Sequence, residues 1–206
     1  MPIEIRTMRP EDVAGAVALQ PVAFPPPFDP ELHWQMEHLL RHIKLFPEGQ
    51  FVAAEGEFVV ASCSNTLISE ESWQAHASWI ETVGDPFLGT FDREGTTLYG
   101  LDISVHPKFR RRGIAKRLYL QRFELVRSLR LVRYGTACRV PGWHHWHSQN
   151  PAGSPEDYVS AVQNSELADP TLTPLLKMSL TLLGVIENYM EDEESGNAAA
   201  LLEWKP

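Results

Sequence analysis

The sequence predicts an α/β (α+β) fold in which one sheet is flanked by helices. Residues 98–105 alternate in side-chain character like a strand of a half-buried sheet, and residues 114–129 carry apolar side chains at helical spacing. Two apolar runs, 51–54 and 58–66, are separated by a short Gly-containing turn, a pattern typical of a β-hairpin. Because no repeat or linker divides the chain, we expect a single domain over residues 1–206.

The other elements follow from strand alternation, helix-capping residues and apolar spacing. The expected further strands are 2–8, 131–140, 184–190 and 198–204, and the expected further helices are 10–20, 29–45, 155–162 and 171–178. Residues 69–97 show no clear period, so they form either a short helix with a loop or a functional lid. Residues 141–154 are expected to be a loop rich in Gly, His and Trp.

The two faces of the 98–105 strand can be assigned residue by residue. One face is expected to carry Tyr99, Leu101, Ile103 and Val105, and the other Leu98, Gly100, Asp102 and Ser104. This assignment places Asp102 one step along its face from Ser104.

The charge of the chain is unevenly distributed. Residues 106–134 hold ten basic side chains and one acid, which leaves a net charge of −18 on the rest of a chain whose total is −9. The basic segment fits either a local polyanionic ligand or an arginine-rich, solvated helix face. The overall negative charge argues against nucleic-acid binding.

Targeting and redox features are few. No apolar run approaches the roughly 18–20 residues that span a bilayer, and the N-terminal residues resemble a strand rather than a signal peptide. We therefore expect a cytoplasmic protein that does not bind membranes. Cys63 and Cys138 form no CxxC pair and lie in apolar runs, so both are expected to be small core residues.

The junction at residues 105–116 carries the strongest chemical signal. A strand ends at Val105 and a helix begins near Gly113, and the first N–H groups of a helix lack internal partners and carry partial positive charge. Gly113 and Ala115 keep the approach to the backbone open, and the arginines before them add charge. Such a turn suits a pyrophosphate. It has neither the GxxxxGK[ST] nor the GxGxxG pattern, so nucleoside-triphosphate and dinucleotide ligands are disfavoured.

The segment Val105-His-Pro-Lys-Phe-Arg-Arg-Arg-Gly-Ile-Ala115 resembles motif A of the GCN5-related N-acetyltransferase (GNAT) superfamily, [Q/R]-x-x-G-x-[G/A] after a strand ending in V-x-P. Arg110, Gly113 and Ala115 match the defined positions of this motif. Further segments resemble a GNAT subgroup sometimes fused to a carbon–nitrogen hydrolase domain, a domain that we do not expect here. These segments are Leu98–Val105, Pro141–Trp143, Ser154–Val159, Asp169–Leu172 and Asn188–Ser195.

The resemblance implies a mixed, mostly antiparallel sheet whose strands 98–105 and 131–140 splay apart, with acetyl-CoA as cosubstrate in the gap. The residues that would bind it are Ile103, Ser104 and Val105 for pantetheine, and Arg110, Arg111, Arg112, Gly113, Ile114, Ala115 and Lys116 for the pyrophosphate. A small-molecule amine would enter near 73–92, 141–150 and 189–195. The strands that hold the two cysteines would flank strand 98–105, about 9–10 Å apart, which is too far for a disulfide.

The catalytic groups are open to more than one interpretation. Asp102 is the expected base, with a structural carboxylate as the other interpretation and Glu81 as the alternative base. The family often has a tyrosine as the acid, but the aligned position here is Leu175. Tyr189 is the expected substitute and Tyr158 the second candidate, although either could be an ordinary packing residue. The amide near Val105 would hold the thioester carbonyl.

Two polar segments remain. The run from Trp143 to His147 contains three histidines but no HExxH spacing, so it fits a surface loop or an acceptor-pocket wall, and we expect no metal. The run Glu191–Glu194 would attract a cationic acceptor such as a polyamine, or it is a solvated turn.

The sequence thus predicts an acetyl-CoA-dependent N-acetyltransferase acting on a small amine. The alternative is a GNAT-fold module that binds acyl-CoA without turnover, as a sensor or partner domain. A nucleic-acid binder that uses the 106–134 arginines is disfavoured by the acidic remainder of the chain. The resemblance also suggests a homodimer.

Overall fold

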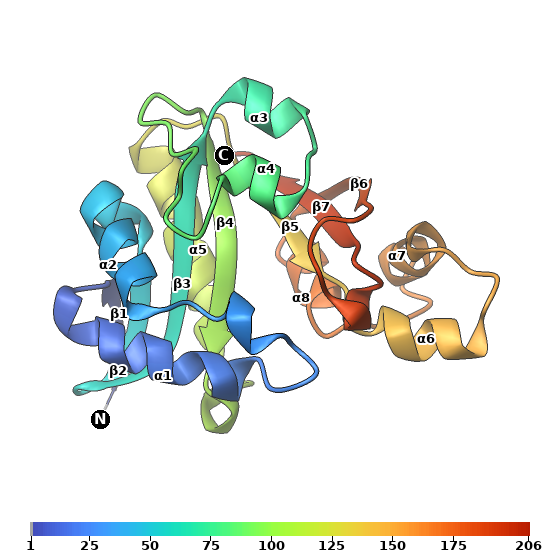
Figure 1. Ribbon diagram of the computed structural model, residues 1–206, viewed down its shortest axis with the longest axis horizontal. Helices are drawn as coiled ribbons and strands as arrows, with labels where there is room; N and C mark the ends of the chain where they lie inside the picture. The colour runs from blue at the N-terminus through green and yellow to red at the C-terminus, as the bar shows by residue number, and fades with distance from the viewer. Residues whose placement is uncertain (1) are drawn as a thin grey trace.

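A computed structural model describes residues 2–206 and shows one seven-stranded sheet in the order β1-β2-β3-β4-β5-β7-β6 (Figure 1). All neighbouring strands pair antiparallel except β4 and β5, which are parallel. The predicted mixed, mostly antiparallel sheet is therefore confirmed. The strands are β1 (Ile3–Thr7), β2 (Phe51–Glu55), β3 (Phe58–Ile68), β4 (Thr97–Val105), β5 (Arg133–Arg139), β6 (Thr181–Ile186) and β7 (Ala199–Trp204).

Helices cover both faces of the sheet. On one face lie α1 (Val13–Ala23), α2 (Met36–Leu45), α3 (Glu70–Gln74) and α4 (Trp79–Val83). On the other face α5 (Ile114–Ser128), α7 (Pro155–Gln163) and α8 (Leu172–Leu176) share a core with Leu98, Cys138 and Leu202. Short 3-10 turns precede or follow several elements, at Pro10–Asp12, Pro30–Leu32, Pro47–Gly49, Pro107–Phe109 and Glu193–Ser195.

Because of a β-bulge, the side chains of β4 lie on other faces than predicted. Ser64 of β3 lies opposite Asp102, but Asn65 lies opposite Gly100, so Leu101 has no partner in the ladder. An extra residue in one strand changes the face to which the following side chains point. Leu101 accordingly packs with Tyr99 on the α1–α4 side, whereas Ile103 and Val105 pack on the α5 side. The strict alternation over 98–105 was wrong at this point.

The segment 143–149, predicted as part of a loop, is a seven-residue helix, α6 (Trp143–Gln149). Trp143 and Trp146 are three residues apart and therefore share one side of the helix. Trp146 packs on Tyr158 with ring centroids 5.6 Å apart, and Trp143 lies against Gly196. This helical spacing was present in the sequence, and the Gly, Asn and Ser residues around it obscured it.

Three further predictions concern strand β6, the segment 69–97 and the two cysteines. Strand β6 spans Thr181–Ile186 rather than 184–190, because Gly184 lies inside it at an irregularity of the β6–β7 ladder. Segment 69–97, predicted as either a short helix with a loop or a functional lid, contains two short helices, α3 and α4. The strands of Cys63 and Cys138 flank β4 as predicted, and both thiols are free.

Candidate functional site

The parallel strands β4 and β5 separate partway along their length. They pair only from Thr97 to Tyr99 on β4 and from Arg133 to Gly135 on β5. The Thr136 hydroxyl donates to the Gly100 carbonyl at 3.1 Å, and β4 then runs on to Val105 with no further β5 partner among residues 2–206. The expected splay is therefore present, and it begins at Gly100 beside the bulge.

The turn after β4 presents a row of free amides. The Arg110 amide donates to the Pro107 carbonyl and the Arg117 amide to the Gly113 carbonyl, and no backbone acceptor among residues 2–206 serves the six amides from 111 to 116. Gly113 has φ 74°, and a Cβ built there would meet nothing within 4 Å. A backbone of positive φ at the N-terminus of a 15-residue helix is a favourable anion cradle.

The arginines of the turn have different roles. Arg110 is committed to the fold, because its Nε donates to the Val105 carbonyl and its Nη2 to the Ala23 carbonyl at the end of α1. The Arg112 guanidinium lies 4.8 Å from the centre of the Phe109 ring and remains exposed. Arg111, Ala115 and Lys116 are exposed as well, whereas Ile114 is buried. The charges available at the rim are therefore those of Arg111, Arg112 and Lys116, and the free amides begin one residue later than predicted.

Asp102 lies at the bulge and is held by several donors. Its Oδ1 accepts from the Ser64 amide at 3.0 Å, and its Oδ2 accepts from the Ser104 hydroxyl at 3.2 Å. Ser104 in turn accepts from Gln20 of α1 at 3.0 Å. Burial raises the pKa of Asp102, while the Arg122 charge and the Trp34 side chain act in the opposite direction. A carboxylate has about four acceptor sites, so the donors from Ser64, Ser104 and Trp34 leave about one site for a further donor.

The candidate acids and the second base have defined partners. The Tyr189 hydroxyl lies 2.8 Å from that of Tyr99, and both residues are buried. Tyr158 donates to Asp169 at 2.9 Å on the α5 side of the sheet. Glu81 caps α4 through Ser78 and is exposed to solvent, and this hydrogen bond lowers its pKa. Tyr189 is therefore the candidate that lies near the start of the gap, since Tyr99 is the last β4 residue paired with β5.

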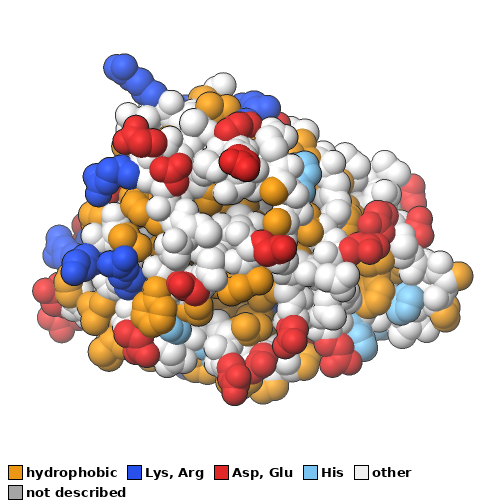
Figure 2. All heavy atoms as spheres, turned by 45° about the horizontal axis from the view of Figure 1, so that its top comes forward, with side chains coloured by type: hydrophobic (Ala, Val, Ile, Leu, Met, Phe, Trp, Pro, Cys, Tyr) orange, Lys and Arg blue, Asp and Glu red, His pale blue; other side chains and the backbone are white. Residues whose placement is uncertain are grey.

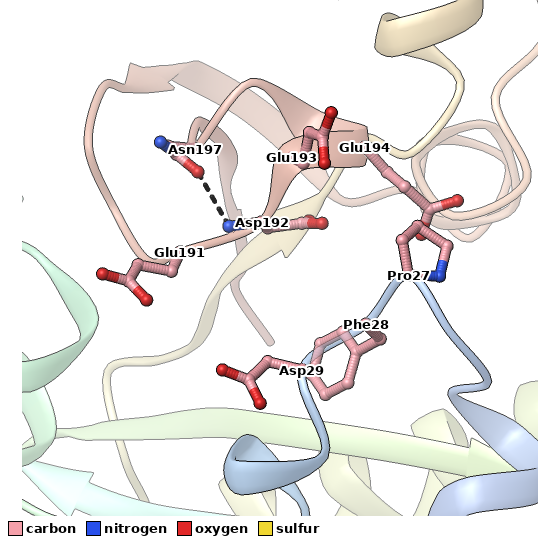
Figure 3. A pocket seen from close by; sticks show the side chains of 8 residues that line it. All are labelled: Pro27, Phe28, Asp29, Glu191, Asp192, Glu193, Glu194 and Asn197. Carbon is pink, nitrogen blue, oxygen red and sulfur yellow. Dashed lines mark hydrogen bonds between the residues drawn. The ribbon is translucent and has the colours of Figure 1, made fainter.

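An acidic cavity of about 210 Å³ lies between the loop after α1 and the turn before β7 (Figure 3). Arg139 at the end of β5 pairs with Asp192 at 2.6 Å and with Glu194 at 2.9 Å, and it lies 4.8 Å from the centre of the Phe28 ring. Arg139 therefore connects the loop after α1 with the turn before β7. Its contact with Phe28 joins two residues that are more than a hundred positions apart in the sequence. The cavity is lined by Pro27, Phe28, Asp29, Glu191, Asp192, Glu193, Glu194 and Asn197.

The wider surface is consistent with this charge. Acidic side chains are spread over the face drawn in Figure 2, whereas Lys and Arg side chains lie towards its left and upper edges.

On α6, His147 stacks on Trp143 and its Nδ1 is 3.1 Å from the Gly153 carbonyl oxygen. Within residues 2–206 no group of three or more His, Cys, Asp or Glu side chains is placed to hold a metal ion, and no helix is long and apolar enough to cross a membrane.

Comparison with known proteins agrees with this geometry. Residues 16–145 match the family model described as the acetyltransferase (GNAT) family. The chain is 33% identical to the uncharacterized N-acetyltransferase YkwB of Bacillus subtilis over 203 residues, 98% of this chain and 88% of that protein. It is 34% identical to the probable hydrolase YhcX of the same organism over 97% of this chain, but it spans only 38% of that protein's length.

Solved structures show the same fold. The loading GNATL domain of CurA from Lyngbya majuscula superposes with a TM-score of 0.83 at 15% identity, covering 100% of this chain and 98% of that one. The GphF GNAT-like decarboxylase in complex with isobutyryl-CoA gives 0.78 at 22% identity, covering 98% of both chains. Because the family model matches residues 16–145 and the 33%-identical relative YkwB is covered over 88% of its length, the chain belongs to the acetyltransferase (GNAT) family.

Proposed function

We propose that residues 1–206 form one acyltransferase domain that transfers an acetyl group from acetyl-CoA to the amine of a small molecule. The observation that carries this proposal is the row of six amides at 111–116 without a backbone acceptor among residues 2–206, in the turn that follows β4, one of the two strands that border the gap. A pyrophosphate satisfies such amides and is favoured by the helix dipole of α5.

The length of the gap suits the rest of the cofactor. Val105 lies five residue steps beyond Gly100, and at a strand rise of about 3.3 Å per residue this is roughly 17 Å. An extended pantetheine arm that starts at the turn and follows the backbone of Ile103, Ser104 and Val105 would bring the thioester close to the bulge. Asp102 and the Tyr99–Tyr189 hydroxyl pair lie at that end of β4.

The acceptor enters from the α1–α4 side, where the acidic cavity opens. Its carboxylates attract a protonated amine, and they favour an acceptor with additional positive charge, such as a polyamine. Asp102 accepts a proton from the ammonium group, the free amine attacks the thioester carbon, and the C–S bond breaks. The departing thiolate takes a proton from the Tyr189 hydroxyl, which Tyr99 orients at 2.8 Å. The acylated nitrogen loses its remaining excess proton as the amide forms, and this proton restores the Tyr189 hydroxyl. The proton held by Asp102 is released to solvent, so one proton is released overall.

Two measurements test this function. Titration calorimetry with acetyl-CoA should show one binding site with an affinity of tens of micromolar or tighter, and no heat at that concentration would refute the site. A thiol-release assay over a panel of monoamines, polyamines and amino acids should then show turnover with the cationic members first. Omission of the amine provides the control for hydrolysis.

The second candidate function is an acyl-CoA-binding module without turnover, and it is supported by the residue at the expected position of the general acid. Leu175 occupies the position where a tyrosine is usual, and the Tyr189 hydroxyl already has Tyr99 as a partner. A module that binds acyl-CoA without turnover would show calorimetric binding and no thiol release with any amine. A cytoplasmic location and a homodimer remain predictions of the sequence, to be checked by fractionation and by light scattering.

A further inference from the structure

Arg122 is a charged residue inside the core of the molecule. It lies on α5, faces the sheet and is only 1% exposed. Its Nη2 donates to the Asp102 carbonyl at 2.5 Å and to the Ser64 carbonyl at 3.3 Å. Its guanidinium also lies over two aromatic rings, 4.8 Å from the centre of Tyr119 and 5.4 Å from that of Tyr134.

These contacts place Arg122 on one side of the β4 bulge and the Asp102 carboxylate on the other. The bulge removes Leu101 from the ladder and leaves backbone groups of Ser64 and Asp102 in need of partners. Arg122 supplies donors to both carbonyls from the α5 face, and the Asp102 carboxylate accepts the Ser64 amide from the α1 face. The side chains of Arg122 and Asp102, which carry opposite charges, therefore both form hydrogen bonds at the β4 bulge.

The packing of the bulge alone does not require a full charge. A buried guanidinium carries a large desolvation penalty unless it is paired, and no carboxylate makes an ion pair with Arg122 within residues 2–206. Its Nε also has no hydrogen-bond partner in that part of the chain. The two carbonyls and the two aromatic rings offset part of this penalty, and a full charge in this place points to a further electrostatic partner.

We propose that Arg122 is a positioning residue for acyl transfer, which fixes the β4 bulge and keeps the Asp102 side chain in its charged, hydrogen-bonded form. This inference rests on the proposed function only in taking Asp102 as the base. The bulge sets the place where β4 leaves β5, so the same contact also fixes the start of the gap.

The groups that face Arg122 leave Asp102 as its electrostatic partner. They are Cys63 on β3, Asp102 on β4, Tyr119 on α5 itself and Tyr134 on β5. Burial raises the pKa of Cys63 to about 11 and raises the pKa of both tyrosines, so these three are neutral at pH 7. Burial raises the pKa of Asp102 as well, and Arg122 counteracts that shift. Loss of the Arg122 charge therefore raises the pKa of Asp102, and a base with a higher pKa becomes active only at higher pH.

The test compares Arg122→Gln, which has an uncharged and shorter side chain with an N–H donor, with Arg122→Lys, which keeps the charge. The Asp102 carboxyl is titrated by 13C NMR and assigned with Asp102→Asn. In Arg122→Gln we expect the midpoint to rise by about one to three units, the range for loss of a nearby opposite charge, and in Arg122→Lys to stay near that of the wild type. The acid limb of kcat/KM for acetyl transfer should move with the NMR midpoint.

A purely structural role would lower stability or kcat in Arg122→Gln and leave both midpoints in place, and that result would overturn the proposal. Arg127→Gln, an exposed position on the same helix, is the matched control and should move neither. If neither Arg122 variant folds, the wild-type titration decides, since an Asp102 midpoint above pH 7 contradicts the proposal. Because the NMR arm needs no turnover, it gives its answer even if no amine proves to be a substrate.

Discussion

The turn at 110–116 and the bulge at Asp102 are the two halves of the candidate site, and they are built in opposite ways. The turn is mostly exposed and contiguous in sequence, and its amides at 111–116 have no backbone acceptor among residues 2–206. The bulge is half-buried at Leu101 and Asp102, and its polar groups have partners from β3, α1 and α5. Ligand binding at the turn depends on backbone amides that lack hydrogen-bond acceptors. The proposed chemistry at the bulge depends on side chains that already have hydrogen-bond partners within the fold.

This difference predicts different responses to mutation. A change in the turn should affect CoA affinity with little effect on the fold, because few protein contacts are lost there. A change at the bulge should affect turnover, with CoA affinity preserved.

Replacement of Gly113 by Asp should have the largest effect and reduce acetyl-CoA affinity by more than about a hundredfold, or about 2.7 kcal/mol. The substitution puts a side chain at φ 74° and a negative charge in the anion cradle. Calorimetry measures the affinity. Gly56→Asp, at φ 65° in the β2–β3 turn, is a control with the same backbone strain away from the site. Equal affinity losses in both variants would contradict the assignment of the turn.

Asp102→Asn should lower kcat/KM by roughly a hundredfold or more, the range for loss of a general base. The amide oxygen can still accept the Ser64 N–H, so the bulge should persist and acetyl-CoA affinity should change little. Steady-state kinetics and calorimetry on the same preparation separate the two effects. Wild-type turnover in this variant would show that Asp102 is a structural carboxylate.

Tyr189→Phe should reduce kcat by about ten- to a hundredfold, with KM for acetyl-CoA unchanged. It removes the proposed proton donor while keeping the ring in its buried place beside Tyr99. Tyr158→Phe, whose hydroxyl is bound to Asp169 on the other face, is the matched control for kcat. A larger loss of kcat in Tyr158→Phe would reverse the assignment.

Arg112→Ala should weaken acetyl-CoA binding only a few-fold, and the loss should shrink as salt is added, because an exposed charge is screened. Arg110→Ala should instead lower the free energy of unfolding by about 1–3 kcal/mol, since its guanidinium holds two backbone carbonyls. Denaturant titration compares the two variants. Equal stabilities would show that Arg110 is a ligand residue and not a structural one.

The sequence predicted the turn better than the bulge for a physical reason. The strand, the glycine and the helix start of the turn are adjacent in the chain, so their pattern is visible locally. The bulge depends on Ser64, Asp102 and Arg122, which come from three elements, and alternation alone placed Leu101 with Ile103. The contact between Phe28 and Arg139 was missed for the same reason. The helical spacing of Trp143 and Trp146 and the capping box of Ser78 and Glu81 are local signals that were overlooked.

The most direct test of the account is a crystal structure of the protein with acetyl-CoA. We expect the pyrophosphate to lie within hydrogen-bond distance of the amides of residues 111–116. We also expect the pantetheine arm to lie between β4 and β5, with the thioester near Asp102. Density for the cofactor in the acidic cavity, or on the surface with those amides unoccupied, would contradict it.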